Sequence, residues 1–399
     1  MQMLSVEDAL TKILATTKPT SKTELISLDS AFHRVLSEPQ FSTVDVPPAD
    51  NSAMDGYAIH TDSLKNCSEN GITISQRIPA GQAANPLKRN TAARIFTGSE
   101  IPKGANAVIM QENCEVNQNK LFIKIFPSSG DHIRKQGQDI TKGSELFQTG
   151  HQLHAPDLGV LASSGIEKIN VYKKLTVGVL TTGDELVSPG KELVPGQIYN
   201  SNQFTLKGLL ESVHIEMIDL GHIPDTLPAT TEALKKASKT VDVVLTTGGV
   251  SAGEEDHIKP AIDALGEISM WKLAIKPGKP LAFGHIAGTP FFGLPGNPVS
   301  VLVTFLIIVR PFLLKTQGLS ESNEDSTLLP ADFSFSKNTS RQEYLRVRIE
   351  NQKLTLFKNQ SSGVLSSASW ANALAIVPIN TDVKPGDLLK TLSFSQLGI

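Results

Sequence analysis

The stretch VDVVLTTGGVSAGEEDHIK, residues 241–259, joins an apolar run to a segment rich in glycine and acids. Three glycines stand among the eight residues 246–253, and Glu254, Glu255 and Asp256 follow them. A plain surface turn needs one or two such residues, whereas a backbone that closely approaches an anion or a metal needs several. The stretch therefore has two interpretations, an ordinary turn after a buried strand or a ligand-binding loop.

A second stretch, KLTVGVLTTGDEL at 174–186, repeats this pattern of an apolar run, Thr-Thr-Gly and acids. Between 171 and 324, apolar runs alternate with amphipathic segments such as SNQFTLKGLLESV and LPATTEALKKASKT. Such alternation predicts an α/β domain with a mostly parallel sheet and helices on both faces. In such sheets ligands bind beyond the carboxyl ends of the strands, where both Thr-Thr-Gly loops would lie.

The sequence patterns outside residues 171–324 are different. Residues 1–40 are predicted to be helical, beginning with a helix capped by Ser5, and together with 140–170 they form an extended N-terminal domain. Residues 41–139 show short apolar runs between Gly, Pro and Asp turns, which predicts a β-rich inserted domain. Residues 325–399 again consist of short β runs and predict a C-terminal β-barrel-like domain.

Composition excludes several classes of protein. With 399 residues, 40% of them hydrophobic, and a formal net charge of -3, the chain has no general attraction to nucleic acid or to an acidic membrane. Its cysteines, Cys67 and Cys114, make no metal-ligand spacing and no disulfide framework, which favours a cytoplasmic location. The apolar run at 299–309, which the Arg310-Pro311 pair ends, is shorter than the ~18 residues of a membrane span, so we expect a fully buried helix there.

Charged residues cluster near the predicted strand ends. Asp184, Glu185 and Asp256 supply the hard oxygen ligands that Mg²⁺ takes when it bridges carboxylates to substrate phosphates. In WKLAIKPGKP, strand alternation predicts that Lys272 and Lys276 share a face, and the Pro-Gly turn would bring the third lysine of the segment, Lys279, close to them. Ammonium groups beside an acidic metal cluster would suit an anionic substrate that carries phosphates.

The segment GLPGNPVSVLVTF, from Gly293, predicts the start of a buried helix with Asn297 as its cap and Pro298 at its first position. Structural capping explains it well, and the exposed N–H groups of the helix start could also hold an anion. Gly249 to Gly253 fits the G-x-S-x-G nucleophile elbow around Ser251, with Asp263 and His285 as convenient partners, but the twin loop at 181–183 has no serine. Neither a P-loop nor a G-x-G-x-x-G motif is present in the sequence.

Seven segments in one order resemble the molybdopterin molybdenumtransferase family, which comprises MoeA-like proteins and the equivalent domain of gephyrin. They are DNSAMDGYA, RIFTGSEIPKGANAVIMQE, TTGDEL, GQIYNSN, TTGGVSAGEED, WKLAIKPGKP and GLPGNPVS. The resemblance covers essentially the whole chain. It implies an enzyme of molybdenum cofactor biosynthesis that inserts molybdenum from molybdate into adenylylated molybdopterin, releases AMP and uses Mg²⁺.

The resemblance also implies site residues, motif by motif. Positions matching the family's catalytic residues are Asp55, Thr97, Asp139, Glu185, Asp225, Asp256, Lys272 and Lys276. Residues expected to bind the pterin nucleotide are Gly183, Gly248, Gly249, Ser251, Gly253, Lys279, Pro295, Asn297 and Pro298. Glu185 and Asp256 would also hold the metal, and the lysines would meet phosphate or molybdate. After GEED this chain has His257, where the family more often has an aromatic residue.

The resemblance implies a homodimer in which the β-rich domain of one subunit completes the site of the other, with the N-terminal domain contributing to dimerisation. It also implies contact with a molybdopterin adenylyltransferase and with molybdoenzyme maturation proteins. A non-catalytic, gephyrin-like scaffold that binds partner proteins is the alternative. The complete set of acids and lysines favours the enzyme, because a scaffold has no physical need to keep them.

Overall fold

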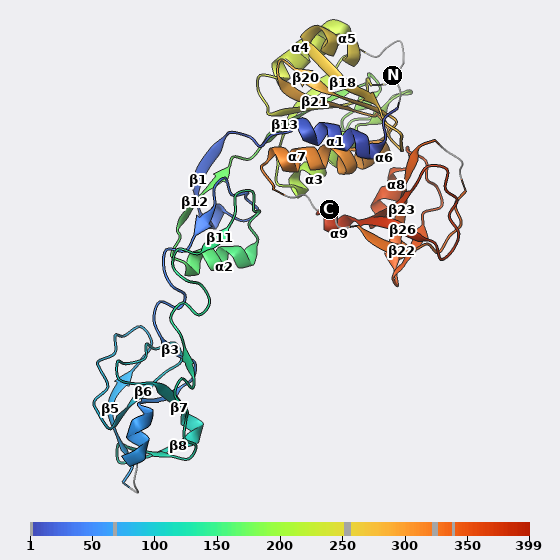
Figure 1. The fold of residues 1–399 in the computed structure, drawn as a ribbon. Coiled ribbons are helices and arrows are strands. Elements are labelled where there is room, and N and C mark those ends of the chain that lie inside the picture. Colours follow the sequence, from blue (N-terminus) through green and yellow to red (C-terminus); the bar gives the residue numbers. More distant parts are fainter. Residues whose placement is uncertain (1–2, 67–69, 251–256, 321–325, 337–339) are drawn as a thin grey trace.

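The computed structural model describes residues 3–66, 70–250, 257–320, 326–336 and 340–399. The described chain forms an elongated molecule with two bulky ends (Figure 1). The α/β domain and the C-terminal domain lie together at one end, and the β-rich module made by residues 41–139 lies at the other. An extended segment of paired strands connects the two ends, so most of the length of the molecule comes from this connection.

The α/β domain is built on a six-stranded sheet with the order β16-β13-β17-β21-β20-β18. Its strands are β13 (Thr176–Thr182), β16 (Glu216–Ile223), β17 (Val243–Thr247), β18 (Gly266–Lys272), β20 (Pro280–Ile286) and β21 (Thr289–Leu294). Neighbours among β16, β13, β17 and β21 are parallel, and β20 runs antiparallel to β21 and β18. The predicted α/β class with a mostly parallel sheet is confirmed.

Helices cover both faces of this sheet because its strands are apolar on both sides. Val243 and Leu245 of β17 pack into a core with α1 (Val6–Thr16), α3 (Ser201–Ser212) and α6 (Pro298–Thr304). Val244, which points the opposite way, packs with α4 (Leu227–Ala237) and α5 (Ile258–Leu265). This alternation along a strand buried on both faces is typical of parallel sheets.

One long buried helix follows the sheet. It begins as α6, passes through a π-helical turn at Phe305–Val309 and continues as α7 (Arg310–Thr316). The segment Pro298–Thr316 is long and apolar enough to span a membrane, but 83% of its most apolar window is buried inside the protein, which is typical of a core helix. The prediction of a buried helix is confirmed. The helix continues past Arg310-Pro311, because the π turn takes the Arg310 N–H to the Phe305 carbonyl directly before the proline.

The N-terminal segment is helical only in part. Ser5 caps α1 as predicted, its Oγ accepting from the Asp8 N–H at 3.0 Å. Helix beyond Thr16 is a wrong prediction, because β1 (Thr23–Ser27) pairs with β12 (Lys168–Tyr172), and this tertiary pairing decides the local structure. The 140–170 region adds β11 (Glu145–Phe147), which pairs with β2 (Gln40–Phe41), and α2 (Ala155–Ser163).

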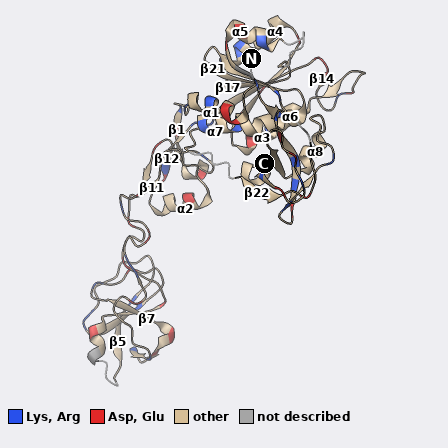
Figure 2. Ribbon diagram, turned by 45° about the vertical axis from the view of Figure 1, so that its right-hand side comes forward, with Lys and Arg blue, Asp and Glu red and all other residues tan. Residues whose placement is uncertain are grey.

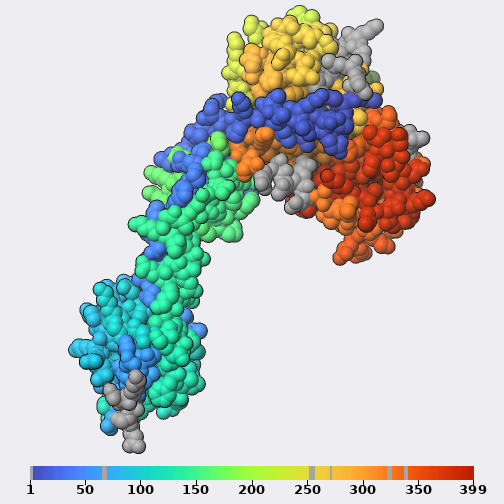
Figure 3. Space-filling model, in the orientation of Figure 1, coloured from blue at the N-terminus to red at the C-terminus, as the bar shows by residue number. Residues whose placement is uncertain are grey.

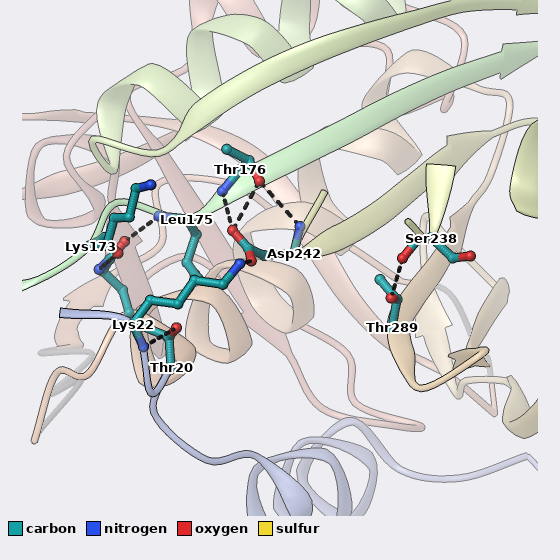
Figure 4. A network of polar contacts seen from close by, with 9 residues as sticks. Thr20, Lys22, Lys173, Leu175, Thr176, Ser238, Asp242 and Thr289 are labelled. Carbon is teal, nitrogen blue, oxygen red and sulfur yellow. Dashed lines mark hydrogen bonds and ion pairs between the residues drawn. The ribbon is translucent and has the colours of Figure 1, made fainter. Parts of the chain in front are cut away.

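A polar network anchors this extended segment to the α/β domain (Figure 4). Lys22 Nζ lies 2.6 Å from Asp242 Oδ1, and Asp242 Oδ2 accepts from the Thr176 N–H and Oγ1, both at 2.9 Å. Burial alone would raise the pKa of Asp242, but the hydrogen bonds from Lys22 and Thr176 outweigh it and hold the pKa below its usual value. The Asp242 carboxylate thus stays charged and joins the extended segment, through Lys22, to Thr176 at the start of β13.

Both remaining parts are β-rich. The module at the far end contains a six-stranded sheet with the order β7-β4-β6-β5-β9-β8. Its strands are β4 (Gly56–Ile59), β5 (Ile72–Ile78), β6 (Thr91–Ile95), β7 (Ala107–Met110), β8 (Cys114–Asn117) and β9 (Lys120–Ile123), beside the short pair β3 (Asn51–Ser52) and β10 (Ile133–Arg134).

The C-terminal sheet contains a strand from the α/β domain. It joins β22 (Thr327–Pro330), β23 (Gln342–Glu350), β24 (Lys353–Leu356), β25 (Ala373–Val377) and β26 (Leu388–Ser393), with helices α8 (Leu365–Trp370) and α9 (Phe394–Leu397) beside them. The short strand β19 (Ile275–Lys276) leaves the α/β domain and pairs in parallel with β23. This pairing ties the two domains together next to the lysine-rich segment.

Candidate functional site

Four loops meet at one edge of the α/β sheet. Because β16, β13, β17 and β21 run in parallel, their carboxyl ends lie side by side. Asp225 follows β16, Gly183 to Glu185 follow β13, Gly248 and Gly249 follow β17, and Pro295 to Asn297 follow β21. The prediction that the two Thr-Thr-Gly loops share an edge is confirmed, since Thr181 lies opposite Thr247 in the β13–β17 register.

The glycine after β17 has a steric reason. Gly248 has a φ of +85°, and a Cβ there would lie 2.9 Å from Thr182 Oγ1 and 3.0 Å from the Thr182 carbonyl oxygen. A side chain at this position would strain the backbone and push the two loops apart. The bare backbone therefore allows the loops after β13 and β17 to lie close together at the sheet edge.

A cavity of about 1160 Å³ opens at this edge. Its floor is formed by the ends of β13 and β17, including Thr182 and Thr247, and one side by the starts of α3 and α6. The short parallel strands β14 (Leu186–Val187) and β15 (Ile198–Tyr199) line another side, and Figure 2 shows this ribbon projecting on the side of α6 and α8. Residues 358–363 and Arg341 of the C-terminal domain complete the wall.

The electrostatics of the cavity favour an anion. Lys276, Lys279, Arg341 and Lys358 line it, whereas Glu185 is the one acid among the lining residues that the structure describes. The starts of α3 and α6 also line the cavity, and the positive end of each helix dipole attracts negative charge, although at α6 Pro298 has no N–H and the Val299 N–H donates to the Ser362 carbonyl. Cations and helix starts at one opening suit a ligand with phosphate or another oxyanion.

Two buried oxygens of cavity-lining residues, Asn202 Oδ1 and Thr247 Oγ1, have no hydrogen-bond partner among the residues that the structure describes. The Asn202 amide nitrogen is used by the fold, because it donates to the Gly296 carbonyl at 2.7 Å, which holds the oxygen in place. Leaving such atoms unpaired costs free energy, so they are expected to find partners when a ligand or water fills the cavity. They are fixed polar groups on which a ligand can be oriented.

A buried ion pair supports the wall shared with the C-terminal domain. Lys276 Nζ lies 2.7 Å from Glu343 Oε1, whose side chain is 6% exposed. Arg346, on the same strand as Glu343, is also buried, and this burial lowers the pKa of its guanidinium to about 10 while the Glu343 carboxylate raises it. Lys276 therefore lines the cavity while its ammonium group is paired with the Glu343 carboxylate.

The structure brings some predicted residues to the cavity and not others. Predicted residues that line it are Glu185, Gly248, Lys276, Lys279, Pro295, Asn297 and Pro298. Gly183, Gly249, Asp225 and Lys272 lie at the same sheet edge outside the lining. The Asp225 N–H donates to Asp184 Oδ1 at 3.4 Å. Ser251, Gly253 and Asp256 fall outside the described residues, so the predicted metal role of Asp256 and the nucleophile elbow have no structural description.

Two local predictions are corrected. Lys272 and Lys276 do not share a strand face, because Lys272 ends β18 whereas Lys276 belongs to β19 in the C-terminal sheet. Asn297 stands at the N-cap of α6 and Pro298 at its start, but the Asn297 side chain makes no capping hydrogen bond. That side chain lines the cavity instead, so a ligand can reach both the amide and the helix start.

Asp55, Thr97 and Asp139 lie outside the cavity of their own chain. Asp55 Oδ1 accepts from the Thr97 N–H and Oγ1, both at 2.8 Å, and these hydrogen bonds lower the pKa of Asp55. The Asp139 N–H donates to the Val46 carbonyl at 3.0 Å. The module that carries Asp55 and Thr97 is distant from the α/β domain (Figure 3), so within one chain these three residues do not meet Glu185 or Lys276.

Sequence reasoning missed the contribution of the C-terminal domain. Arg341 and Lys358 and the wall residues Asn359, Gln360, Ser361, Ser362 and Gly363 line the cavity. The segment KNQSSG at 358–363 follows a β run and is polar and glycine-containing, a local signal of the same kind as the loops after β13 and β17. Its place beside α6 depends on the pairing of β19 with β23, which joins distant parts of the chain.

The fold and the cavity define a multidomain α/β protein with a cavity rich in lysine and arginine at the carboxyl edge of its sheet. Three family models match the chain: MoeA N-terminal region (domain I and II) over residues 4–165, probable molybdopterin binding domain over 178–315, and MoeA C-terminal region (domain IV) over 329–394.

Relatives that match most of the chain agree with these models. The molybdopterin molybdenumtransferase of Haemophilus influenzae is 43% identical, over 79% of this chain and 78% of that protein. The protein of the same name from Nostoc sp. is 34% identical over 90% and 85%. A crystal structure of the molybdopterin biosynthesis MoeA protein of Pyrococcus horikoshii matches with a TM-score of 0.84 and 30% identity, over 98% of this chain and 100% of that chain. The chain belongs to the molybdopterin molybdenumtransferase family and is an enzyme of molybdenum cofactor biosynthesis.

Proposed function

We propose that this enzyme transfers molybdenum from molybdate to adenylylated molybdopterin and releases AMP. The observation that supports it most is the cavity at the sheet edge, where Lys276, Lys279, Arg341 and Lys358 surround two helix starts. Both proposed substrates are anions, and both must be held at once. A cavity of about 1160 Å³ has room for a nucleotide-sized ligand together with an oxyanion.

The polar groups divide the cavity into two kinds of contact. The fixed oxygens Asn202 Oδ1 and Thr247 Oγ1, with the starts of α3 and α6, suit the polar edges and phosphates of the pterin nucleotide. Lys276 and Arg341, beside the wall 359–363, suit molybdate. Placing molybdate and the phosphoanhydride in one cavity converts their encounter into an intramolecular event, which lowers the barrier.

Mg²⁺ fits the donors that the described residues provide. It is commonly bound through one or two carboxylates, with water and substrate phosphates completing its shell. Glu185 lines the cavity and would hold it, although the described residues contain no group of three or more metal-binding side chains. When bound, Mg²⁺ would neutralise phosphate charge that the lysines leave uncompensated.

The chain's own residues supply orientation and charge and need no covalent nucleophile. In the proposed reaction an oxygen of molybdate attacks the adenylyl phosphorus, and the phosphoanhydride bond to the molybdopterin phosphate breaks. Lys276, Lys279 and Arg341 stabilise the negative charge that develops on the phosphate oxygens. The two dithiolene thiols then bond to molybdenum: the Mo–O bond to AMP breaks and releases AMP, and one further molybdate oxygen leaves as water with the two thiol protons, so that molybdenum stays in the same oxidation state.

We further propose that the enzyme acts as a homodimer in which the β-rich module of one subunit reaches the cavity of the other. Asp55, Thr97 and Asp139 would thereby join a site from which they are remote in one chain. Cytoplasmic location and contact with a molybdopterin adenylyltransferase and with molybdoenzyme maturation proteins remain predictions. A gephyrin-like scaffold role receives less support, because partner binding gives no reason for fixed polar atoms inside a cationic cavity.

AMP release from adenylylated molybdopterin tests the proposal. The reaction is followed with and without molybdate and Mg²⁺, for the wild type and for Asp256→Ala. We expect release that needs both ions and decreases sharply in the variant. A well-folded dimeric wild type that releases no AMP would turn the interpretation toward the scaffold, and full activity in Asp256→Ala would remove the metal role of that loop.

A further inference from the structure

One side of the cavity differs in chemistry from the rest of its lining. The ribbon formed by β14 and β15 (Figure 2) contributes Leu186, Ile198 and Tyr199 to the lining, and Ile198 and Tyr199 are 54% and 45% exposed. Two other large apolar side chains of the lining, Phe335 and Leu356, pack against the core of the C-terminal domain. The ribbon therefore offers exposed apolar and aromatic surface to a ligand in the cavity.

Hydrogen bonds hold this surface in place. The Ile198 N–H donates to the Glu185 carbonyl at 2.8 Å, and the Tyr199 hydroxyl donates to the Lys191 carbonyl at 2.8 Å. The Tyr199 ring is thus fixed both at the backbone and at its far end, so it loses little conformational freedom when a ligand covers it. Because the hydroxyl proton is used by the fold, Tyr199 offers a ligand mainly the face of its ring.

Such a surface suits a planar heteroaromatic ring and not a phosphate group. Phosphate gains nothing from apolar side chains and is attracted to Lys276, Lys279 and Arg341 elsewhere in the lining. A heteroaromatic ring has a π-face that stacks on an aromatic side chain, and this contact contributes about 1–3 kcal/mol per base. Adenylylated molybdopterin carries two such rings, the adenine and the pterin.

The ribbon is also connected to the phosphate-binding part of the cavity. It starts directly after Glu185, the residue proposed above to hold Mg²⁺. The hydrogen bond from the Ile198 N–H to the Glu185 carbonyl fixes the returning strand at the same point. A ligand whose phosphates meet Glu185 and the cations can therefore place a ring on the strands that begin and end beside that acid.

We propose that Tyr199, with the β14–β15 ribbon, is the platform on which a planar heteroaromatic ring of the substrate stacks. This inference rests on the proposed function, and it adds the part of the cavity that recognises a ring. It assigns to Tyr199 a contribution to the affinity for ring-bearing ligands and none to the binding of phosphate alone. Adenine and the pterin share this stacking chemistry, and separate ligands distinguish them.

Two variants and a matched control isolate the ring. Tyr199→Ala removes the platform, whereas Tyr199→Phe keeps the ring and loses only the hydrogen bond to the Lys191 carbonyl. Phe204→Ala is the control, because Phe204 on α3 is an aromatic residue with 54% exposure that does not line the cavity. The Tm of each variant shows whether it folds like the wild type.

The measurement is the Kd of three ligands by titration calorimetry: AMP, molybdopterin under anaerobic conditions, and ribose 5-phosphate, which has the sugar and phosphate of AMP without the base. In Tyr199→Ala we expect the Kd of at least one ring-bearing ligand to rise about tenfold, the effect of one lost stacking contact. Tyr199→Phe and Phe204→Ala should stay within about twofold of the wild type, and the Kd of ribose 5-phosphate should not change. Weaker binding of AMP assigns the adenine to the ribbon, and weaker binding of molybdopterin assigns the pterin.

Unchanged Kd values for both ring-bearing ligands in Tyr199→Ala would overturn the proposal. An equal loss for ribose 5-phosphate would also overturn it, because the ribbon would then support the phosphate-binding residues and not a ring.

A contact between subunits is the competing explanation of the exposed ribbon, whose Leu193 and Val194 are also exposed. In that case Tyr199→Ala lowers the dimer fraction in size-exclusion chromatography and leaves the Kd values unchanged, which contradicts the proposal. A wild type that binds the ligands but releases no AMP contradicts the proposed function alone, and the Kd values then still decide whether the ribbon binds a ring. A wild type that binds none of the three ligands contradicts both.

Discussion

The sheet edge of the α/β domain and the β-rich module both carry the polar loops of the family, yet they differ in how far one chain completes them. At the sheet edge, loops from four parallel strands and a wall from the C-terminal domain converge on one cavity. In the module, Asp55 and Thr97 are joined by hydrogen bonds of 2.8 Å. Neither residue lines the cavity of its own chain. The first region is assembled within one chain, whereas the second would meet the same substrate only in the homodimer proposed above.

The strongest way to break the sheet-edge site is to remove its paired lysine. Lys276→Met alone would leave Glu343 buried without its partner, so Glu343→Gln is combined with it to limit the loss of stability. We expect the double variant to lose about 100-fold in kcat/KM for AMP release, as when one fixed stabilising group is removed. The single variant Glu343→Gln is the control, and a double variant that keeps full activity would exclude Lys276 from the site.

Backbone geometry at the same edge gives the next largest effect. Gly248→Ala places a Cβ about 3 Å from Thr182 at a φ of +85°, so we expect a loss of about 1–3 kcal/mol in unfolding free energy and lower activity. Gly208→Ala is the matched control, because Gly208 lies within α3 with open space around it. That change should stabilise the helix by about 1 kcal/mol. Chemical denaturation measures both, and equal effects would refute the steric argument.

The polar network of Lys22, Asp242 and Thr176, which anchors the extended segment to the α/β domain, should weaken at low pH. Because the folded pKa of Asp242 is lowered, its contribution is complete above the unfolded pKa of about 4 and is lost as the pH falls through the folded value. Asp242→Asn should therefore cost about 1–2 kcal/mol of unfolding free energy at pH 7 and much less near pH 3. Asp263→Asn, at the exposed pair with Lys259, should change stability little, and a pH-independent difference for Asp242→Asn would contradict the assignment.

A smaller effect of pH on stability is expected where two stacked histidines join the extended N-terminal segment to the α/β domain. The rings of His33 and His214 lie 4.0 Å apart, and burial, followed by neighbouring positive groups including His154 and Lys174, lowers both pKa values. Their stabilising contribution is complete above pH 6.5 and decreases as the pH falls below it.

His214→Asn suits the positive φ of 58° at this position. Between about pH 7 and pH 5, the variant should lose a few tenths of a kcal/mol less unfolding free energy than the wild type. The effect is small because both rings are partly solvated. Thermal unfolding across this pH range measures the change. An unchanged slope of stability against pH would show that the stacked pair does not titrate with folding.

Much of the sheet edge could be predicted from sequence because its signals are local. Apolar runs such as VDVVL, followed by Thr-Thr-Gly, specify a buried strand and a tight turn, and parallel strands necessarily place such turns at one edge. Ser5 and Pro298 mark helix starts by the same kind of local chemistry. The role of Lys276 followed from family resemblance, and the structure places it at the cavity.

The rest depends on contacts between distant segments, which no local pattern contains. Residues 23–27 form a strand because 168–172 pair with them, and Lys276 belongs to another strand than Lys272 because β19 joins β23. The wall 359–363 becomes part of the cavity through the same pairing and through Arg346. Neither strand alternation nor capping signals specify which distant segment each of these residues contacts.

One measurement tests most directly whether the two regions form a single site between subunits. Asp55→Asn, altered in the module, and Lys276→Met/Glu343→Gln, altered at the sheet edge, are each nearly inactive by this account. When the two are unfolded and refolded together, about half of the dimers should be hybrids with one intact site each, which restores about a quarter of the wild-type AMP release. Activity that stays at the level of the separate variants, in mixtures shown to contain hybrid dimers, would contradict a site shared between the module and the cavity.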